Sequence, residues 1–239
     1  ADLDNTGDQR FEYFGVSATN KEGESDIMPS NSVIMGDAYT LPFADSFAYG
    51  KLAYGIWYSE KTGSNSFGLD DTTSADNDGG CVSFVAAEDK AIASFCSGKI
   101  ALGGCDNPVL TFDYYCQPGS DDVLLTEINR AYIDTTVVKT INMGKETGAT
   151  GWHHAVVSLH AFKSAPYIQL AFLAQIGKTG DKLLIDNIKI ENNPELSVSG
   201  IMTRNEKNKL VYDLSGKLQQ DNNLPQGLYI TGGKKFVIR

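Results

Sequence analysis

Short runs of alternating apolar and polar residues recur along most of this 239-residue chain, separated by Gly, Asn or Asp. In PYIQLAFLAQ, at 166–175, Ile168, Leu170 and Phe172 fall on one face, as a half-buried strand requires. Comparable runs occupy 82–86, 91–100, 108–116, 123–128, 137–142, 154–160 and 182–190. Strands this short and this closely spaced predict an all-β fold, an antiparallel jelly-roll β-sandwich.

The acidic balance of the chain limits its partners. Its formal net charge is −10 at pH 7. Nucleic acids and anionic membranes both attract basic surfaces, so neither is expected as a partner. An acidic protein instead suits divalent cations. No apolar run approaches the roughly 20 residues of a membrane-spanning helix, so we expect no membrane insertion.

Changes of pattern divide the chain into three zones. Residues 1–38 hold two short strands and a glycine turn, too little for a stable domain by itself. Residues 39–193 contain the alternating runs and predict the sandwich. Residues 194–239 begin at a proline and carry strand-like stretches at 209–218 and 227–239, which predict a small β appendage.

Four cysteines lie within 36 positions, and none forms a CxxC pair: Cys81, Cys96, Cys105 and Cys116. A zinc ribbon or a thioredoxin-type site is therefore not expected. Two disulfides with three possible connectivities, and four half-buried free thiols, both remain open.

The histidines make a poor catalytic or metal site. His153 and His154 are neighbours, and adjacent side chains of a strand point to opposite faces. His154 and His160 share a face but lie about 20 Å apart at 3.3 Å per residue. Asp121 and Asp122 lie in a turn-like segment and are expected to be solvated rather than to form a catalytic carboxylate pair.

An aspartate in the strand at 182–190 raises a question of charge burial. Strict alternation would place Asp186 on one face with Leu184, Ile188 and Ile190. An unpaired carboxylate there would cost several kcal/mol, so it needs donors, a rim position or a metal. The segment LDDTTSADNDGG, at 69–80, supplies the acidic oxygens that calcium prefers, although its spacing is not that of an EF-hand. Calcium between this loop and Asp186 is therefore predicted.

The order of motifs in the middle zone resembles a known family. LPFADSF at 41–47 opens the zone, and SGKIALGGCDNPVLTFDYY at 97–115 and GWHHAVVSLHAFKSAPYIQLAF at 151–172 follow in order. LLIDNIKI at 183–190 closes it. Together these segments resemble the MAM-like jelly rolls of Bacteroidetes surface proteins, including the cleaved adhesin modules of secreted proteases.

That resemblance implies structural calcium near the strand ends, as well as a surface for adhesion or carbohydrate binding. It assigns Asp186 as the closing ligand and Asp71, Asp76 and Asp78 as the loop ligands. The family often has Glu just after the opening Phe, where this chain has Ala48. Asp45 is the nearby candidate to replace it, which leaves the number of calcium ions open.

Both ends of the chain carry resemblances of their own. Within residues 1–38, the pattern at Tyr13 to Asn20, Gly23 to Ser25 and Ser30 to Val33 resembles the last hairpin of a fibronectin type III domain, here incomplete. VYDLSGKL, LPQGLYI and GGKKFVIR, between 211 and 239, resemble the C-terminal sorting tail of the type nine secretion route. The tail implies export, and therefore a secreted or outer-surface location.

These features predict a non-catalytic, monomeric adhesion module that is stabilised by calcium and binds carbohydrate or a host glycoprotein. Exposed aromatic rings would hold the sugar, and the candidates are Trp57, Tyr58 and Tyr132, whereas Tyr114 and Trp152 are expected to pack in the core. Adjacent residues of a strand face opposite ways, so either Trp57 or Tyr58 must point outward. The alternatives are a structural spacer and an ancillary domain of a larger secreted glycoside hydrolase or peptidase.

Overall fold

A computed structural model describes residues 3–61, 63–116, 120–130, 134–144 and 150–193, and the backbone of four strands between 211 and 238. The chain divides into two compact units, 1–192 and 193–239. The described residues form strands and two short 3₁₀ turns, Ala48–Gly50 and His160–Phe162. The predicted all-β class is confirmed.

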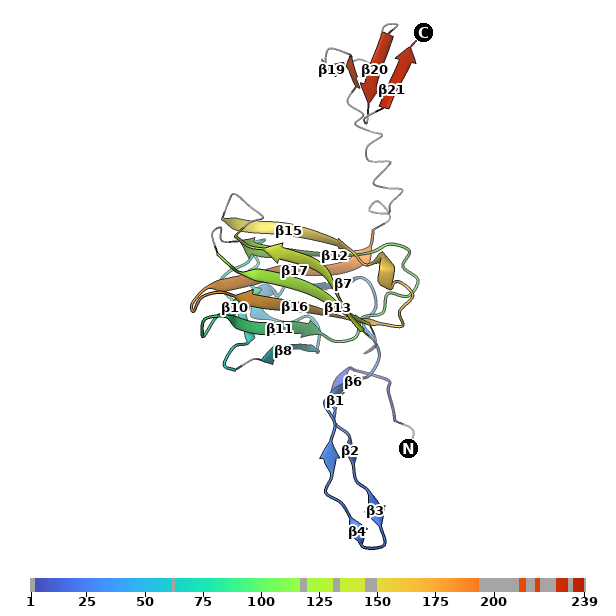
Figure 1. The fold of residues 1–239 in the computed structure, drawn as a ribbon, viewed down its shortest axis with the longest axis vertical. Coiled ribbons are helices and arrows are strands. Elements are labelled where there is room, and N and C mark those ends of the chain that lie inside the picture. The colour runs from blue at the N-terminus through green and yellow to red at the C-terminus, as the bar shows by residue number, and fades with distance from the viewer. Residues whose placement is uncertain are drawn as a thin grey trace. The chain divides into compact units, whose positions relative to one another are not determined.

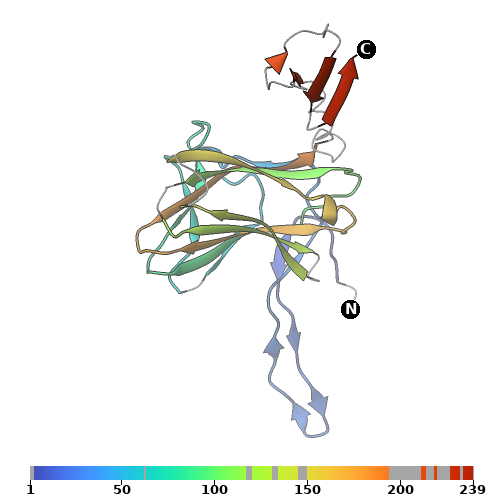
Figure 2. The same cartoon turned by 45° about the horizontal axis from the view of Figure 1, so that its top comes forward.

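Two antiparallel sheets form the sandwich of the first unit and stack face to face (Figure 1, Figure 2). The six-stranded sheet has the order β15 (Gly151–Ser158), β12 (Pro108–Cys116), β17 (Lys182–Asn192), β10 (Cys81–Val85) and β9 (Phe67–Asp70), with β7 (Phe43–Asp45) also paired to β17. The five-stranded sheet has the order β14 (Asp134–Asn142), β13 (Val123–Arg130), β16 (Ile168–Ile176), β11 (Ala91–Ser97) and β8 (Trp57–Lys61).

The core lies between the sheets and is built from alternate residues of each strand. In β16 the inward side chains are the apolar set predicted from the sequence, and Phe172 meets Phe112 of β12 with ring centroids 5.0 Å apart. Each fully buried Leu, Ile or Phe stabilises the fold by about 1.5–3 kcal/mol relative to exposure. Two half-polar sheets can bury enough apolar surface only by packing against each other, which is why this pattern gives a sandwich.

A β-bulge in β17 changes which face Asp186 occupies. Thr111 pairs with Lys189 and Asp113 pairs with Asp186, so two residues of β17 oppose one of β12. Asn187 absorbs the extra residue with a left-handed φ of 50°. As a result Ile185 and Ile188 both enter the core, whereas Asp186 lies on the outer side of the sheet. The prediction that Asp186 shares a face with Ile188 and Ile190 is wrong, because it assumed unbroken alternation.

An N-terminal ribbon of paired strands precedes the sandwich in the first unit (Figure 1). We call this segment, residues 10–35, the ribbon. Its pairs are β1 (Arg10–Glu12) with β6 (Val33–Met35), β2 (Gly15–Val16) with β5 (Met28–Pro29), and β3 (Thr19–Asn20) with β4 (Gly23–Glu24). The side chains toward the β3–β4 turn are exposed, whereas Ile34 of β6 is buried. The ribbon is thus anchored at its β1–β6 end.

The second unit contains four strands, in the order β19 (Leu218–Gln219), β18 (Val211–Asp213), β20 (Gly227–Thr231) and β21 (Lys234–Ile238). They lie within the two stretches predicted to be strands, except that β19 extends one residue further, to Gln219. Within the part of the chain that is described, no helix has the length and apolar character needed to cross a membrane.

Three of the four cysteines are buried free thiols: Cys81, Cys96 and Cys105. The side chain of Cys116 lies outside the described residues. Two disulfides would need all four sulfurs, so that alternative is not the one the structure adopts. Burial raises the pKa of the Cys81 and Cys96 thiols to about 12.

Candidate functional site

Three carboxylates gather on the outer side of the six-stranded sheet. Asp186 is positioned by the bulge in β17, and Asp76 and Asp78 belong to the loop between β9 and β10. One oxygen from each of the three lies within 4.8 Å of the others. We call these residues the carboxylate cluster. Oxygen atoms from several carboxylates at this separation are the kind of ligand set that calcium binds.

Local hydrogen bonds and one glycine shape the acidic loop. Asp70, at the end of β9, accepts bonds from the Thr72 and Thr73 amides (2.9 and 3.1 Å) and from Lys182 Nζ (3.0 Å). The Thr72 hydroxyl also donates to Asp70, at 2.7 Å. This bond, together with those from the Thr72 amide and Lys182, holds the pKa of Asp70 well below its usual range. At the other end of the loop, a Cβ on Gly80 would lie 1.7 Å from a backbone oxygen, so only glycine fits there.

Asp186 is a charged group in a fully buried position, with 0% of its surface exposed. Its carboxylate accepts hydrogen bonds from two backbone amides, those of Ala75 and Asn187, each at 2.7 Å. Its pKa is nevertheless raised to about 6, because the effect of burial, together with the negative charges of Asp76 and Asp78, outweighs that of the two amides. A cation beside the three carboxylates would reverse this effect by stabilising the ionised form.

Asp78 offers an independent sign that the cluster fits a cation. Its Oδ2 accepts a hydrogen bond from the Ser46 hydroxyl at 2.8 Å. Its Oδ1 is buried, and none of the described residues donates a hydrogen bond to it. An unpartnered buried carboxylate oxygen is costly, and it lies in a cluster that could share a divalent ion. The residues present therefore fit calcium.

The structure brings together three of the five predicted metal ligands. Asp71 is exposed and lies outside the carboxylate cluster. Asp45 is buried elsewhere and accepts bonds from Trp57 Nε1 (2.9 Å) and from the amides of Phe47 and Ala53. Burial raises the pKa of Asp45, and these three donors oppose that rise. Asp45 thus completes a buried hydrogen-bond network, which leaves its carboxylate no free position for a metal.

A concave surface, separate from the carboxylate cluster, lies on the outer face of the five-stranded sheet. The register places Tyr58 beside Cys96 and Cys96 beside Ala171, which in turn pairs with Glu127. Small side chains in the centre of this row, with larger ones at its ends, leave a cavity of about 120 Å³. We call this surface the groove. Its polar lining comes from all five strands of the sheet, and consists of Glu60, Ser94, Glu127, Asn129, Thr135 and Gln169.

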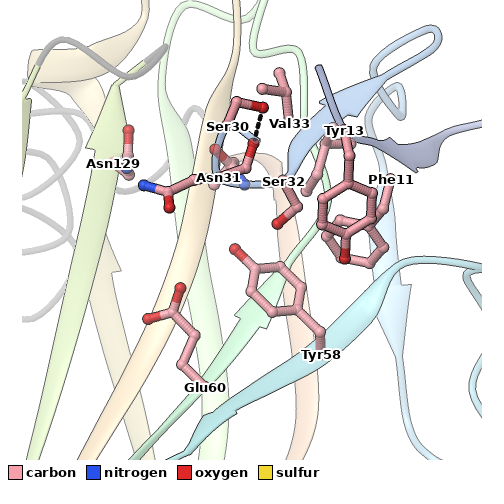
Figure 3. A pocket seen from close by; sticks show the side chains of 11 residues that line it. Phe11, Tyr13, Ser30, Asn31, Ser32, Val33, Tyr58, Glu60 and Asn129 are labelled. Atoms are coloured by element: carbon pink, nitrogen blue, oxygen red, sulfur yellow. Dashed lines mark hydrogen bonds between the residues drawn. The ribbon is translucent and has the colours of Figure 1, made fainter. Parts of the chain in front are cut away.

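The groove continues into a larger cavity of about 800 Å³ beside the ribbon. Tyr58, Glu60, Asn129 and Gln169 line both spaces. In Figure 3, Tyr58 and Glu60 rise from the sheet and face residues of the ribbon. This volume falls in the range of small-molecule sites, roughly 300–1,000 Å³.

The structure places the predicted sugar-stacking residues in different environments. Tyr58 lies in the groove, whereas Trp57 is only 8% exposed and stacks on Phe95 with ring centroids 4.6 Å apart. The prediction of Trp57 as a ligand contact is therefore corrected, because its ring belongs to the core. Tyr132 lies outside the described residues. Tyr114 is buried as expected, and Trp152 is half-buried.

One histidine does have a carboxylate partner. His154 Nδ1 lies 2.6 Å from Asp113 Oδ1, and Asn187 donates to the other oxygen of Asp113 at 2.9 Å. Such a pair could orient a general base. Within the described residues, however, no hydroxyl or thiol group contacts His154, so the pair lacks a nucleophile there.

No protein-family model matches the chain, and no curated protein matches it in sequence. Among solved structures, it resembles the K1 cleaved adhesin domain of Lys-gingipain from Porphyromonas gingivalis, with 16% identity over 63% of this chain and 98% of that one, and a TM-score of 0.48. It also resembles TmCBM61, solved with β-1,4-galactotriose (10% identity, 58% and 90% covered, TM-score 0.46), and a cyclase from Fischerella sp. TAU (13%, 57% and 84%, 0.43). Likenesses this distant, which include an enzyme, assign neither a family nor a ligand.

Proposed function

We propose that this chain is a non-catalytic adhesion module that binds carbohydrate through the groove. The observation that carries the proposal is the lining of the groove, where the ring of Tyr58 adjoins amide, hydroxyl and carboxylate groups. The apolar C–H faces of a sugar pack on an aromatic ring, while its hydroxyl groups exchange hydrogen bonds with such side chains. A host glycoprotein would be recognised through its glycan.

Gln169 supports the proposal from the floor of the groove. It is only 4% exposed, and its Nε2 makes a long contact of 3.5 Å with the Ser97 carbonyl. Its Oε1 accepts no hydrogen bond from the described residues. Gln169 lines both the groove and the larger cavity, so its side chain belongs to the polar surface that a sugar would meet.

In the same proposal, calcium binds the carboxylate cluster and has a structural role. An ion held by Asp76, Asp78 and Asp186 would tie the acidic loop to β17 and neutralise the buried charge of Asp186. Calcium sites of extracellular modules bind weakly, at about 10⁻⁴–10⁻³ M. The secreted or outer-surface location implied by the sequence resemblances suits such a site.

The roles of the two ends are part of the proposal too. Residues 1–38 would be the closing hairpin of a fibronectin type III-like domain, and residues 194–239 a sorting tail for export. The competing function is a structural spacer, which predicts no ligand for the groove.

A glycan and glycoprotein array, run with calcium and again with chelator, tests the proposal. We expect saturable binding to one glycan class, loss of that binding in Tyr58→Ala, and weakening in chelator. Tyr115→Ala is the matched control, because Tyr115 is a half-buried tyrosine of the other sheet and does not line the groove. A blank array from folded protein would favour the spacer.

A further inference from the structure

We propose that the ribbon forms one wall of the ligand site, and that the site takes a neutral oligosaccharide held between Tyr58 of the sheet and Tyr13 of the ribbon, with Phe11 packed against Tyr58 to position its ring. This inference rests on the proposed function and adds to it a second binding element and a ligand class. It also makes the N-terminal strands part of the binding site rather than a linker.

Two aromatic side chains of the ribbon, Phe11 and Tyr13, line the larger cavity together with Tyr58 (Figure 3). Phe11 packs edge-on against Tyr58, with ring centroids 5.3 Å apart and an angle of 88° between the rings. Tyr13 lines the same cavity but is 70% exposed, so most of its ring is free of protein contact. A large exposed aromatic ring at the rim of a cavity is a feature of ligand-binding surfaces.

The rest of this wall offers hydrogen-bonding groups that sugars use. Ser30, Asn31 and Ser32 of the ribbon line the cavity opposite Glu60 and Asn129 of the sheet. Hydroxyl, amide and carboxylate groups together can both donate to and accept from sugar hydroxyls. The side chain of Gln169, an amide that can donate and accept, lines the same cavity.

The charges around the cavity select the ligand class. Glu60 is the single charged residue in its described lining, and neither this cavity nor the groove is lined by Lys, Arg or His in that part of the chain. A sulfated, sialylated or uronic-acid sugar would meet a carboxylate with no cation to offset it. A neutral oligosaccharide meets no such penalty.

Specific contacts tie the segment just before the ribbon, residues 5–9, to the sandwich, so the wall that follows has a defined position. Gln9 Oε1 accepts from the Lys99 amide at 2.7 Å, and Gln9 Nε2 donates to the Lys99 carbonyl at 2.9 Å. Asn5 Oδ1 accepts from the amide of Gly36 at 3.0 Å and from Lys99 Nζ at 3.3 Å. The three bonds to Lys99 join residues about 90 positions apart in the chain.

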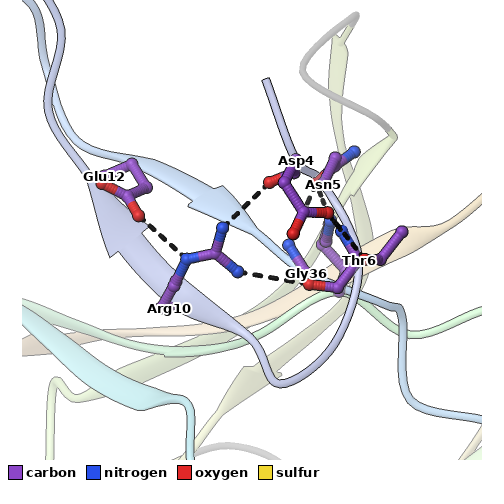
Figure 4. Close-up of polar contacts among 7 residues, drawn as sticks. Asp4, Asn5, Thr6, Arg10, Glu12 and Gly36 are labelled. Atoms are coloured by element: carbon purple, nitrogen blue, oxygen red, sulfur yellow. Dashed lines mark hydrogen bonds and ion pairs between the residues drawn. The ribbon is translucent and has the colours of Figure 1, made fainter. Parts of the chain in front are cut away.

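A second set of contacts rigidifies the ribbon at its anchored end (Figure 4). Arg10 donates to Glu12 Oε1 at 2.8 Å and to the backbone carbonyls of Asp4 and Thr6. Lys99 is only 3% exposed and lies over the ring of Tyr167, with Nζ 5.4 Å from its centroid. A wall positioned in this way loses little further freedom when a ligand binds.

The test measures affinities by titration calorimetry in calcium, using the full chain. The probes are neutral cello-, manno- and galacto-oligosaccharides, trigalacturonate, sialyllactose and oligolysine. We expect a neutral oligosaccharide to bind, and Tyr13→Ala to weaken that binding about tenfold, the equivalent of one well-placed aromatic contact. Met28→Ala is the control, because Met28 is exposed on the same ribbon but does not line the cavity.

Two further measurements separate the role of the wall from folding. Gln9→Ala should weaken binding by releasing the ribbon, and in the wild type the ligand should slow amide hydrogen exchange in 10–13 and 33–35. If Tyr58→Ala loses binding while Tyr13→Ala, Phe11→Ala and Gln9→Ala bind as wild type, the inference is wrong and the proposed function stands. If the acidic sugars or oligolysine bind better, the ligand class is wrong. If no oligosaccharide binds, both proposals fail.

Discussion

Replacing Asp186 by asparagine should abolish the response of the protein to calcium. The substitution keeps the size of the side chain and removes its charge. Both carboxylate oxygens of Asp186 accept a backbone N–H, so the amide group of asparagine must leave one of them unpaired. That loss costs about 1–3 kcal/mol. Removing the buried charge offsets it.

The size of the offset follows from the pKa of Asp186. Its folded pKa of about 6, against an ordinary 3.8, corresponds to about 3 kcal/mol. Because the folded pKa is raised, the folded state binds more protons than the unfolded state between about pH 4 and pH 6. Without metal, the stability of the wild type relative to Asp186→Asn should therefore fall by up to about 3 kcal/mol as the pH rises from about 4 to 6. Above pH 6 the two should be nearly equal.

Calcium should reverse the comparison. Calcium at a hundred times its dissociation constant adds about 2.7 kcal/mol to the free energy of unfolding. For a unit of this size that is roughly 5–11 °C in melting temperature. Thermal denaturation of both proteins from pH 4 to 8, in chelator and in about 10–100 mM calcium, a hundred times the dissociation constants of such sites, measures these differences in stability. We expect the wild type alone to gain stability in calcium.

The matched control for this experiment is Asp106→Asn, which changes an exposed aspartate outside the carboxylate cluster. It should keep the full calcium response. The reasoning is refuted if the wild type gains no stability in calcium, or if Asp186→Asn gains as much as the wild type.

Gly80→Ala should lower stability by about 1–3 kcal/mol, because its Cβ would lie 1.7 Å from the carbonyl oxygen of Phe47, whereas Gly68→Ala meets no atom within 4 Å and should have a much smaller effect. Chemical denaturation compares the two, and equal losses would contradict the packing argument. Cys81 and Cys96 should react with iodoacetamide at pH 8 more than about a hundredfold more slowly in the folded than in the unfolded protein, because burial raises the pKa of each thiol to about 12. Mass spectrometry of timed samples measures this, and rapid labelling of the native state would show that these thiols are not buried.

The sequence by itself determined the elements and the class of fold. Period-2 alternation is a local property, since neighbouring side chains of a strand always point opposite ways, and runs such as 166–175 therefore predicted both the strand and its buried face. The same local chemistry indicated an acidic loop at 69–80 and a strand aspartate that needed a partner. Three of the five predicted ligands, Asp76, Asp78 and Asp186, do come together.

The tertiary structure decided what local patterns do not encode. The bulge at Asn187 moves Asp186 to the outer side of the sheet, and it arises from pairing with β12, some 70 residues earlier. Trp57 donates a hydrogen bond to Asp45 because β7 and β8 meet in the core. The groove needs the register of several strands, and its wall needs the ribbon to dock on Lys99. The bulge, the groove and its wall depend on contacts between residues far apart in the chain, and the Asp45–Trp57 bond joins strands of different sheets. All of these contacts exist only once the sheets have paired and packed.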